Sequence, residues 1–431
     1  MKTAAFYTLG CKVNQYETEA VEELFLNDGY EIVPFSDKAD YYIINTCSVT
    51  SMSDRKSRQM IRRAKKTNPD AVIAVMGCYS QTAPDEVLDI DGVNLVLGTK
   101  DKGSIVNLIR NMTVSDKLNA VSCVKDNHEY ENLSVTRTPG RTRAYIKIQD
   151  GCSQFCSYCI IPYARGPVRS RCEADIISEV KTLADAGYRE IVLTGIHAAS
   201  YGKDLENTSL AILLNKLDKI ENIKRIRLSS IEPMTLNSQF VEDIKGCKKL
   251  CAHFHISLQS GCDATLKRMN RHYTTAQFKE VVAGLRNAFS DCAITTDIMT
   301  GFAGETDEEF SKTLEFVKEI SFSEAHVFQY SQRRGTPAAK RPDQIPPEIK
   351  EQRSKEIIKI TEKSKAEFLQ AHKGKVMEVL FETATPDGLY EGKTSNYITV
   401  HASADEDVCG KFRNVLLGEA KNGIIFGETI D

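Results

Sequence analysis

The stretch that decides the fold reads Gly151-Cys152-Ser153-Gln154-Phe155-Cys156-Ser157-Tyr158-Cys159-Ile160-Ile161-Pro162-Tyr163-Ala164-Arg165-Gly166. Its three cysteines follow a C-x3-C-x2-C spacing, which suits a short loop wrapped around three corners of a small metal cluster. An ordinary [4Fe-4S] electron-transfer cluster takes four cysteines, whereas three leave one iron open to a cofactor or a substrate. An open coordination position indicates chemistry, by the logic that separates catalytic from structural zinc.

A zinc loop and three buried thiols are the alternative interpretations of this stretch. Zinc normally takes a fourth Cys or His close by, and none follows within the usual few residues. Cys247 and Cys251, with His253 and His255, form a second group that could be drawn as a zinc site. The two histidines alternate on an expected strand, which favours packing or barrel lining over metal binding.

The length and composition of the chain limit the classes of protein to which it can belong. The chain has 431 residues, enough for two or three domains, and its 41% hydrophobic and 27% charged content is typical of a soluble globular protein. A net charge of -3 means that a nucleic acid partner must meet a local basic patch. Thirteen cysteines without a secretory signal, and no run approaching the roughly 18 apolar residues of a membrane span, predict a cytoplasmic protein with no membrane contact.

The first 135 residues alternate between expected strands and helices, which predicts a mostly parallel, doubly wound sheet. The expected elements are strands at 3–9, 41–45, 72–76 and 95–97 and helices at 17–27, 54–67 and 102–111. Cys11, Cys47 and Cys78 each come directly after an expected strand. Because open α/β folds build their sites at the carboxyl edge of the sheet, these thiols are predicted to converge there as a second cluster site.

The α/β pattern resumes after a linker that contains Thr138-Pro139-Gly140. Six expected strands, at 144–149, 191–193, 225–228, 255–258, 294–298 and 325–328, predict a partial (β/α)6 barrel. The C-x3-C-x2-C loop follows the first of them, where such a barrel places catalysis. A charged helix over 346–372 then leads to a tail with strands at 376–381, 397–400 and 414–417, which predicts a small all-β barrel. The expected domains are 1–135, 138–372 and 373–431.

Five motifs together resemble the radical S-adenosylmethionine (SAM) methylthiotransferases over nearly the whole chain. They are the central cysteine loop, Thr8-Leu9-Gly10-Cys11-Lys12-Val13-Asn14-Gln15-Tyr16-Glu17, Asn45-Thr46-Cys47-Ser48-Val49-Thr50, Gly77-Cys78-Tyr79 and Glu391-Gly392-Lys393-Thr394-Ser395-Asn396-Tyr397. The resemblance implies a methylthiotransferase domain, a radical SAM barrel and a carboxyl-terminal RNA-binding TRAM barrel. The residues after Cys11 and Cys47 resemble the branch that acts on N6-threonylcarbamoyladenosine at position 37 of tRNA. Branches for isopentenyladenosine-37 of tRNA and for an aspartate of a ribosomal protein are the alternatives.

The resemblance implies two [4Fe-4S] clusters. Cys152, Cys156 and Cys159 would hold the one that binds SAM and cleaves it to a 5'-deoxyadenosyl radical. The other triad, Cys11, Cys47 and Cys78, would hold the one that carries the sulfur before transfer to adenine C2. An aromatic C–H has no acid or base handle, which explains why a radical is used. Implied partners are the tRNA, an electron donor such as flavodoxin or ferredoxin, and a sulfur source.

Five further positions match SAM contacts of the family, and each could also be a strand-end turn or cap: Thr194, Gly195, Gln259, Ser260 and Asp297. Glu232, after the third expected strand, could contact SAM or the adenosine, or be a turn residue. Tyr158, the aromatic residue just before Cys159, is also a candidate for cofactor binding. Two family prolines are replaced here, by Ala303 in Gly301-Phe302-Ala303-Gly304-Glu305-Thr306 and by Gln329 in Phe328-Gln329-Tyr330-Ser331. Because proline fixes φ, both replacements remove a fixed φ angle from a loop at the barrel mouth, which bears on the rigidity of these loops more than on the identity of the ligands.

The clearest basic feature is the run from Arg55 to Lys66. At helical spacing Arg55, Arg58, Arg62 and Lys66 share one face, which suits phosphates. Such a stripe is often only a solvated face, but its closeness to Cys47 favours tRNA. A non-catalytic zinc or redox-sensing RNA-binding protein is the remaining alternative.

Overall fold

The amino-terminal part of the computed structural model, which describes residues 1–430, is a six-stranded parallel sheet flanked by helices. Its strand order is β2-β1-β3-β4-β5-β6. The elements are β1 (Thr3–Thr8), α1 (Lys12–Asn27), β2 (Glu31–Ile32), β3 (Tyr41–Thr46), α2 (Ser51–Thr67), β4 (Val72–Gly77), α3 (Cys78–Thr82), α4 (Pro84–Leu88), β5 (Val93–Val96), α5 (Ile105–Ile109) and β6 (Leu118–Asn119). Every residue of β3 and β4 is buried, as near-continuous apolar runs in a doubly covered parallel sheet require.

The central part supplies six parallel strands in chain order. Its elements are β7 (Arg143–Asp150), α6 (Ile161–Arg165), β8 (Arg169–Ser170), α7 (Glu173–Asp185), β9 (Glu190–Gly195), α8 (Leu210–Leu217), β10 (Arg225–Leu228), α9 (Ser238–Ile244), β11 (His253–Gln259), α10 (Asp263–Arg268), α11 (Thr275–Ala288), β12 (Ala293–Thr300), α12 (Asp307–Ile320), β13 (Glu324–Gln329) and α13 (Pro347–Gln370). Sheets β10-β9-β7-β8 and β11-β12-β13 meet through parallel bridges Ile226–Leu250 and Ile231–Ile256. The result is the predicted open barrel, with β8 added antiparallel to β7.

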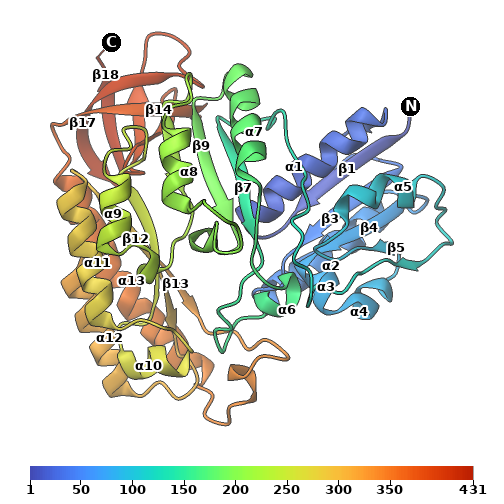
Figure 1. Cartoon of the computed structure of the whole chain (residues 1–431), viewed down its shortest axis with the longest axis horizontal. Coiled ribbons are helices and arrows are strands. Elements are labelled where there is room, and N and C mark those ends of the chain that lie inside the picture. Colours follow the sequence, from blue (N-terminus) through green and yellow to red (C-terminus); the bar gives the residue numbers. More distant parts are fainter. Residues whose placement is uncertain (431) are drawn as a thin grey trace.

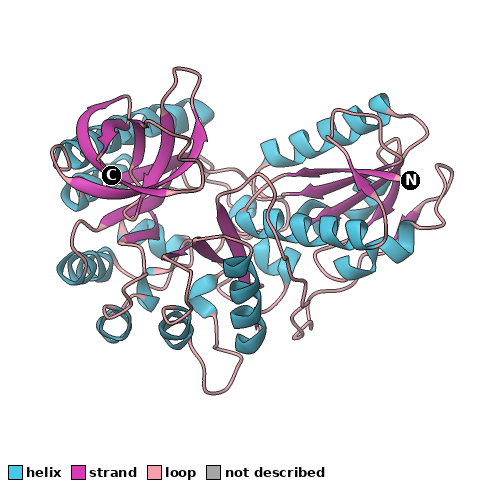
Figure 2. Cartoon of the chain, turned by 90° about the horizontal axis from the view of Figure 1, so that it is seen from above, coloured by secondary structure: helices cyan, strands magenta, loops and turns pink. Residues whose placement is uncertain are grey.

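The carboxyl-terminal part is a closed five-stranded barrel in the order β14-β15-β16-β18-β17. Its strands are β14 (Val376–Ala384), β15 (Tyr390–Thr394), β16 (Thr399–Ser403), β17 (Phe412–Lys421) and β18 (Ile424–Thr429). Figure 1 places this barrel and the amino-terminal sheet on opposite sides of the central part, and Figure 2 shows the same arrangement from above. None of the helices in residues 1–430 is long and apolar enough to cross a membrane.

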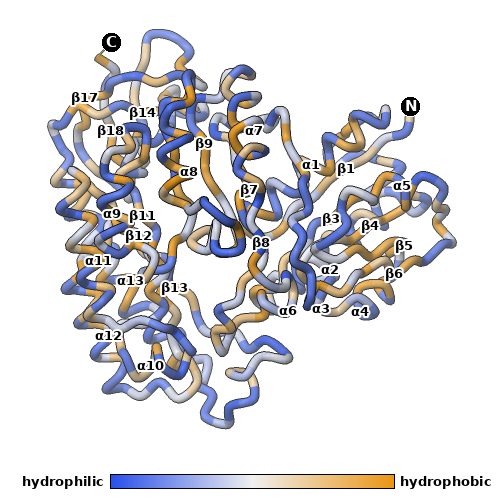
Figure 3. The backbone as a smooth tube through the Cα atoms, viewed as in Figure 1, coloured by the Kyte–Doolittle hydropathy of each residue, from blue (hydrophilic) through white to orange (hydrophobic). Residues whose placement is uncertain are grey.

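Helix α1 joins the amino-terminal sheet to the central part. Val21 and Phe25 belong to the hydrophobic core on one face of the sheet, whereas Tyr16 and Ala20 belong to the large core of the central part. The Tyr16 hydroxyl also donates to the Leu133 carbonyl at 2.7 Å. The hydropathy colouring of Figure 3 shows the apolar strands of both parts, between which α1 lies. This helix therefore sets the position of the residues at its amino-terminal end, beginning with Cys11.

Several predicted elements differ from those observed. Helix α1 begins at Lys12 rather than at 17, because Gly10, with φ of 104°, turns the chain directly after β1. The helix expected over 102–111 is a 3₁₀ turn, Lys102–Ser104, followed by the shorter α5. The tail has five strands rather than three. Gly392 in β15 and Gly427 in β18 weaken the strand signal, yet a Cβ at either would lie 2.6 Å or less from the neighbouring strand.

Candidate active site

One cavity of about 880 Å³ lies where the three parts of the chain meet. Its wall includes Cys11 and Lys12 from the start of α1, all three thiols of the C-x3-C-x2-C loop, the ends of β9 to β12, and Tyr397 from the carboxyl-terminal barrel. This volume is at the upper end of the range for ligand pockets, enough for more than one small molecule. Thr194, Gly195 and Gln259 lie at the carboxyl ends of β9 and β11, where such barrels place chemistry. The cavity extends along the barrel interior to His253 and Glu324, the first residues of β11 and β13.

The Cys152, Cys156 and Cys159 thiols lie in a loop fixed at several points. The Cys152 amide donates to the Gly166 carbonyl at 3.0 Å and the Cys159 amide to the Cys156 carbonyl at 2.9 Å. Arg271 donates to the Cys156 sulfur at 3.5 Å. Burial raises the pKa of Cys152 to about 11 and that of Cys159 to about 12, so a metal must displace their protons on binding.

The second triad lies at the carboxyl edge of the amino-terminal sheet. Cys11 is the N-cap of α1, Cys47 follows β3, and Cys78 begins α3. A Cβ on Gly10 would lie 2.8 Å from the Cys47 Cβ and 3.1 Å from its sulfur, so only glycine allows this approach. Burial, with smaller contributions from Cys47 and Cys11 and against the charge of Arg165, raises the pKa of Cys78 to about 12. The three thiols are therefore close enough to interact electrostatically.

Neither triad is arranged for a single ion. Within residues 1–430, no three His, Cys, Asp or Glu side chains meet around one metal-ion position. In an iron-sulfur cubane each thiolate binds a different iron, so its ligands lie further apart than the ligands of one zinc ion. All thirteen cysteines are free, so both triads are available as ligands.

A buried ion network connects the two triads. Arg165, in α6, donates to the Cys78 sulfur at 3.4 Å, to Glu17 at 2.6 Å and to Asp150 at 3.2 Å. Lys147 bridges Glu17 and Asp150, at 2.7 Å from each. Although burial opposes it, Arg165, Lys102 and Lys147 lower the pKa of Glu17 to about 2. Because Asp150 is two residues before Cys152, this network fixes one triad relative to the other.

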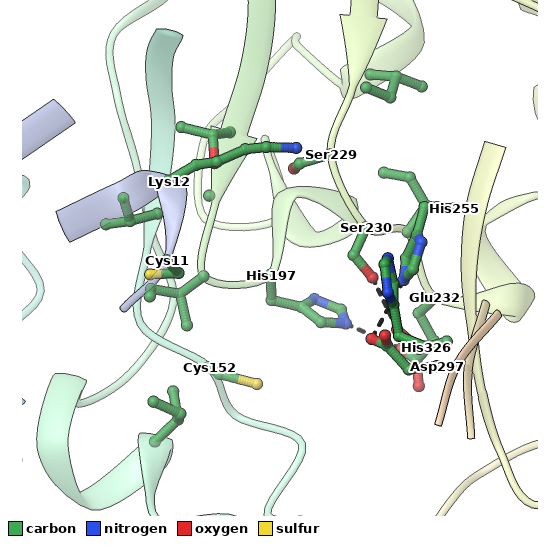
Figure 4. Close-up of a pocket in the computed structure, with 18 of the residues that line it drawn as sticks. Cys11, Lys12, Cys152, His197, Ser229, Ser230, Glu232, His255, Asp297 and His326 are labelled. Atoms are coloured by element: carbon green, nitrogen blue, oxygen red, sulfur yellow. Dashed lines mark hydrogen bonds and ion pairs between the residues drawn. The ribbon is translucent and has the colours of Figure 1, made fainter. Parts of the chain in front are cut away.

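Two carboxylate pairs form the polar wall of the cavity. Glu232 accepts from Gln154 at 2.8 Å and lies 3.1 Å from His197 Nε2, while His255 Nε2 lies 3.2 Å from Asp297 (Figure 4). Although burial opposes it, the hydrogen bond from His197 and the charge of Arg271 lower the pKa of Glu232. Charged and hydrogen-bonding groups thus share the wall of this cavity with the three thiols of the C-x3-C-x2-C loop.

Two family descriptions match the chain, "Uncharacterized protein family UPF0004" over residues 3–98 and the "Radical SAM superfamily" over residues 146–317. The chain is 44% identical to the "Threonylcarbamoyladenosine tRNA methylthiotransferase MtaB" of Bacillus subtilis (strain 168), over 97% of this chain and 94% of the relative. The MtaB of Aquifex aeolicus (strain VF5) is 38% identical over 96% of this chain and 99% of the relative. The chain is a radical SAM methylthiotransferase.

A second group of relatives shares this family. The "tRNA-2-methylthio-N(6)-dimethylallyladenosine synthase" of Acetivibrio thermocellus is 35% identical over 98% of this chain and 90% of the relative. Among solved structures, the radical SAM methyltransferase TsrM of Kitasatospora setae gives a TM-score of 0.61 at 12% identity, over 79% of this chain and 77% of that chain. At that identity the likeness shows the fold alone. Family membership confirms the predicted transferase class, with SAM and [4Fe-4S] clusters as cofactors.

The structure of the methylthiotransferase places most of the predicted SAM-contacting residues on the cavity wall. Tyr158, Thr194, Gly195, Glu232, Gln259 and Asp297 line it. Ser260 is outside this wall; it is fully buried, and its hydroxyl lies 3.3 Å from that of Thr313. His253 and His255 also line the cavity, as their alternation on β11 predicted.

The two replaced prolines are in loops held by other contacts. The Gly301 amide donates to Glu305 at 2.9 Å, and Glu305 pairs with Arg353 at 2.8 Å. Ala303 is fully buried in this loop. Gln329 pairs with Thr300 at the end of β13. An ion pair in the first loop and the pairing of β13 with β12 in the second therefore hold the two positions at which the family has proline.

The basic stripe of α2 is only partly free. Arg55, Arg62 and Lys66 are exposed, whereas Arg58 is half-buried and donates to the Tyr79 hydroxyl at 2.9 Å. Arg58 also pairs with Glu86 at 3.5 Å. Three of the four predicted phosphate contacts are thus available, and Arg58 packs against the sheet domain.

Sequence reasoning missed the ion network, Lys12 and the role of Tyr397. Asn14, Glu17 and Arg165 were inside the quoted motifs, but nothing in one sequence shows that residues about 150 positions apart pair. Tyr397, with φ of 70°, stacks on His253 at 4.7 Å between ring centres. The motif at 391–397, which the resemblance assigns to an RNA-binding barrel, also joins the carboxyl-terminal barrel to the central part, because Arg227 donates to the Ser395 carbonyl at 2.9 Å.

Proposed function

We propose that this methylthiotransferase modifies C2 of N6-threonylcarbamoyladenosine at position 37 of tRNA. The observation that carries the proposal is the shared cavity, whose wall includes Cys11 of one triad and all three thiols of the other. Two sites that open onto one volume suit a reaction in which hydrogen is removed from a carbon and sulfur is delivered to that carbon. The 44% identical relative is named for this substrate.

Cys152, Cys156 and Cys159 would hold the cluster that binds SAM, and Cys11, Cys47 and Cys78 would hold the second one. Bound there, these groups supply a reducing electron, a SAM-derived radical that abstracts hydrogen, and the sulfur with its methyl group. Arg165 donates to Cys78, so it stabilises negative charge on that ligand. Arg271 does the same at Cys156.

The chain's other groups would bind and orient SAM and the adenosine. Glu232 and Asp297 present carboxylates for an ammonium or for ribose hydroxyls, and Tyr158, Thr194, Gly195 and Gln259 complete the wall. Ser260 would act indirectly, since its hydroxyl accepts from the Cys262 amide at 3.3 Å in the turn after Gln259. His253 remains neutral because burial lowers its pKa well below the usual value.

We further propose that α2 contacts the tRNA backbone through Arg55, Arg62 and Lys66, with Arg58 holding the helix in place. Segments 1–135, 138–372 and 373–431 are proposed as the cluster, radical and RNA-binding units. A small electron donor such as flavodoxin or ferredoxin and a separate sulfur source would serve the enzyme, in the cytoplasm where tRNA is modified.

Nucleoside mass spectrometry on tRNA from a strain lacking this gene tests the substrate. We expect the 2-methylthio derivative of threonylcarbamoyladenosine to disappear and to return on complementation. Loss of the methylthio derivative of isopentenyladenosine instead would favour the dimethylallyladenosine branch. Intact tRNA nucleosides with an unmodified ribosomal-protein aspartate would favour the protein substrate, and no change in either would favour a non-catalytic role.

A further inference from the structure

Lys12 is a cation without a counter-ion at the wall of the cavity. It is the first residue of α1, next to Cys11, and its side chain is half-buried. Figure 4 shows this side chain extending across the cavity toward Ser229. Within residues 1–430, no carboxylate oxygen lies within 4.0 Å of its ammonium, and the ammonium forms no hydrogen bond.

The other charged groups of the wall already have partners. Arg227 pairs with Glu190 at 2.9 Å, and Arg271 lies 3.6 Å from Glu232. The carboxylates are also occupied: Asp297 pairs with His255, and Glu324 with Lys365 at 2.7 Å. An unpaired cation in a partly desolvated site favours an anion on the ligand.

Ser229 is an independent sign of a ligand at the same place. Its side chain is 9% exposed, and its hydroxyl is buried without a hydrogen-bond partner in the described chain. Ser229 lines the cavity with Lys12. An unsatisfied hydroxyl beside an unpaired ammonium suits a carboxylate, which accepts from both.

The position fits one end of the proposed substrate. Adenine C2 and C6 flank N1 in the six-membered ring, and the substituent is attached to N6, the exocyclic nitrogen on C6. When C2 faces the triad that includes Cys11, the group on N6 is within reach of the next residue. A threonylcarbamoyl group ends in a carboxylate, whereas a dimethylallyl group is a hydrocarbon with nothing for a cation to bind.

We propose that Lys12, assisted by Ser229, binds the threonyl carboxylate and selects this nucleoside over the dimethylallyl one. The inference rests on the proposed substrate and adds the residues that recognise it. Lys12 is thus a specificity-determining residue. No bond is made or broken at this position.

Binding of three anticodon stem-loops to the reconstituted protein without reductant tests the proposal. The first carries threonylcarbamoyladenosine, the second the same group with its carboxylate converted to a carboxamide, and the third dimethylallyladenosine. We expect Lys12→Gln to weaken the first by about 10- to 100-fold and to leave the other two within about twofold. Lys12→Arg should keep most of the preference, and Ser229→Ala should lose part of it.

Lys318→Gln is the matched control, since it removes an exposed lysine of α12 that also has no partner in the described chain. Equal weakening of all three stem-loops by Lys12→Gln would overturn the proposal. If this variant loses iron or fails to fold, the wild type and Ser229→Ala are compared instead. The proposal then predicts that the wild type prefers the carboxylate stem-loop over the carboxamide one and that Ser229→Ala reduces this preference. The absence of such a preference in both proteins would overturn the proposal.

Turnover separates this inference from the proposed function. Wild type that methylthiolates the threonylcarbamoyl stem-loop, while Lys12→Gln keeps the full preference for its carboxylate, contradicts only the assignment of Lys12. Wild type that binds and converts the dimethylallyl stem-loop alone contradicts the proposed substrate itself.

Discussion

At the scale of single residues, the spacing of the cysteines predicted the candidate cluster ligands, but it did not predict the charged residues beside them. C-x3-C-x2-C is a local pattern, and three strand-end cysteines could be placed at one sheet edge because parallel strands share an edge. The pairing of Glu17 with Arg165 spans two parts of the chain, and whether Lys12 forms an ion pair depends on every side chain around it. Such properties emerge only once the chain has folded.

Arg165→Gln tests the ion network. The change leaves Glu17 and Asp150 buried with fewer cations, which costs about 3–5 kcal/mol when one partner of a buried pair is removed. Because Arg165 also contacts Cys78, we expect the second cluster to be lost first. Iron analysis after anaerobic reconstitution should fall from about eight toward about four per chain, with SAM cleavage retained. Arg110→Gln, at an exposed pair with Asp28, is the control; equal iron loss there would contradict this role.

Glu22→Gln tests a largely buried carboxylate on α1 whose pKa is raised. Burial and the nearby Glu19 raise the pKa of Glu22 to about 7 from its ordinary 4.5. The folded state therefore binds the proton more tightly, so stability falls as pH rises from about 4.5 to about 7. We expect Glu22→Gln to stabilise the protein by about 1–3 kcal/mol at pH 8 and much less at pH 5.

Urea unfolding followed by circular dichroism at both pH values measures this difference. Glu315→Gln removes a solvent-exposed carboxylate of α12 and should change neither midpoint. A Glu22→Gln gain that is the same at pH 5 and pH 8 would show that the buried charge is not the cause.

At the scale of elements, strands with continuous apolar runs were predicted well. β3, β4 and β10 were found within two residues of their expected ends. Elements were missed where glycine or short length removed the pattern, as for β2, β6, β8, β15 and β18. α1 was predicted five residues too short because a cysteine N-cap is not a recognised start signal.

Helix α2 carries the prediction for tRNA binding. Changing Arg55, Arg62 and Lys66 together to Gln removes three exposed cations, so we expect weaker binding of all tRNAs and a salt dependence whose slope falls by about two to three. Filter binding over a series of salt concentrations measures it. The matched control changes Lys355, Lys359 and Lys363, a similar exposed stripe on α13, to Gln. An equal loss of slope in the control would contradict an interface on α2.

At the scale of the whole molecule, the cavity depends on all three parts of the chain. Tyr397 of the carboxyl-terminal barrel lies over Arg143 and Arg227, with the guanidinium carbons 5.5 Å and 4.7 Å from its ring centre. Although burial opposes it, Arg143 and Lys12 lower the pKa of Tyr397. The barrel therefore closes the catalytic volume in addition to any contact with RNA, which composition could not show.

Tyr397→Ala should open this wall to water. We expect SAM cleavage to continue while the methylthio product formed per SAM cleaved falls by about tenfold, because exclusion of water protects the radical step. Tyr390→Ala, in the same barrel and outside the cavity wall, is the control and should leave the ratio unchanged. The two products are quantified together by mass spectrometry. An unchanged ratio in Tyr397→Ala would show that the barrel does not close the site.

The central claim is that two clusters in one cavity divide the reaction between them. The direct measurement uses a triple variant, Cys11→Ala with Cys47→Ala and Cys78→Ala, assayed for iron, 5'-deoxyadenosine and methylthio-nucleoside. We predict about four irons per chain, continued formation of 5'-deoxyadenosine and no methylthio product. Methylthio product from this variant, or a wild type that never holds more than about four irons, would contradict the account.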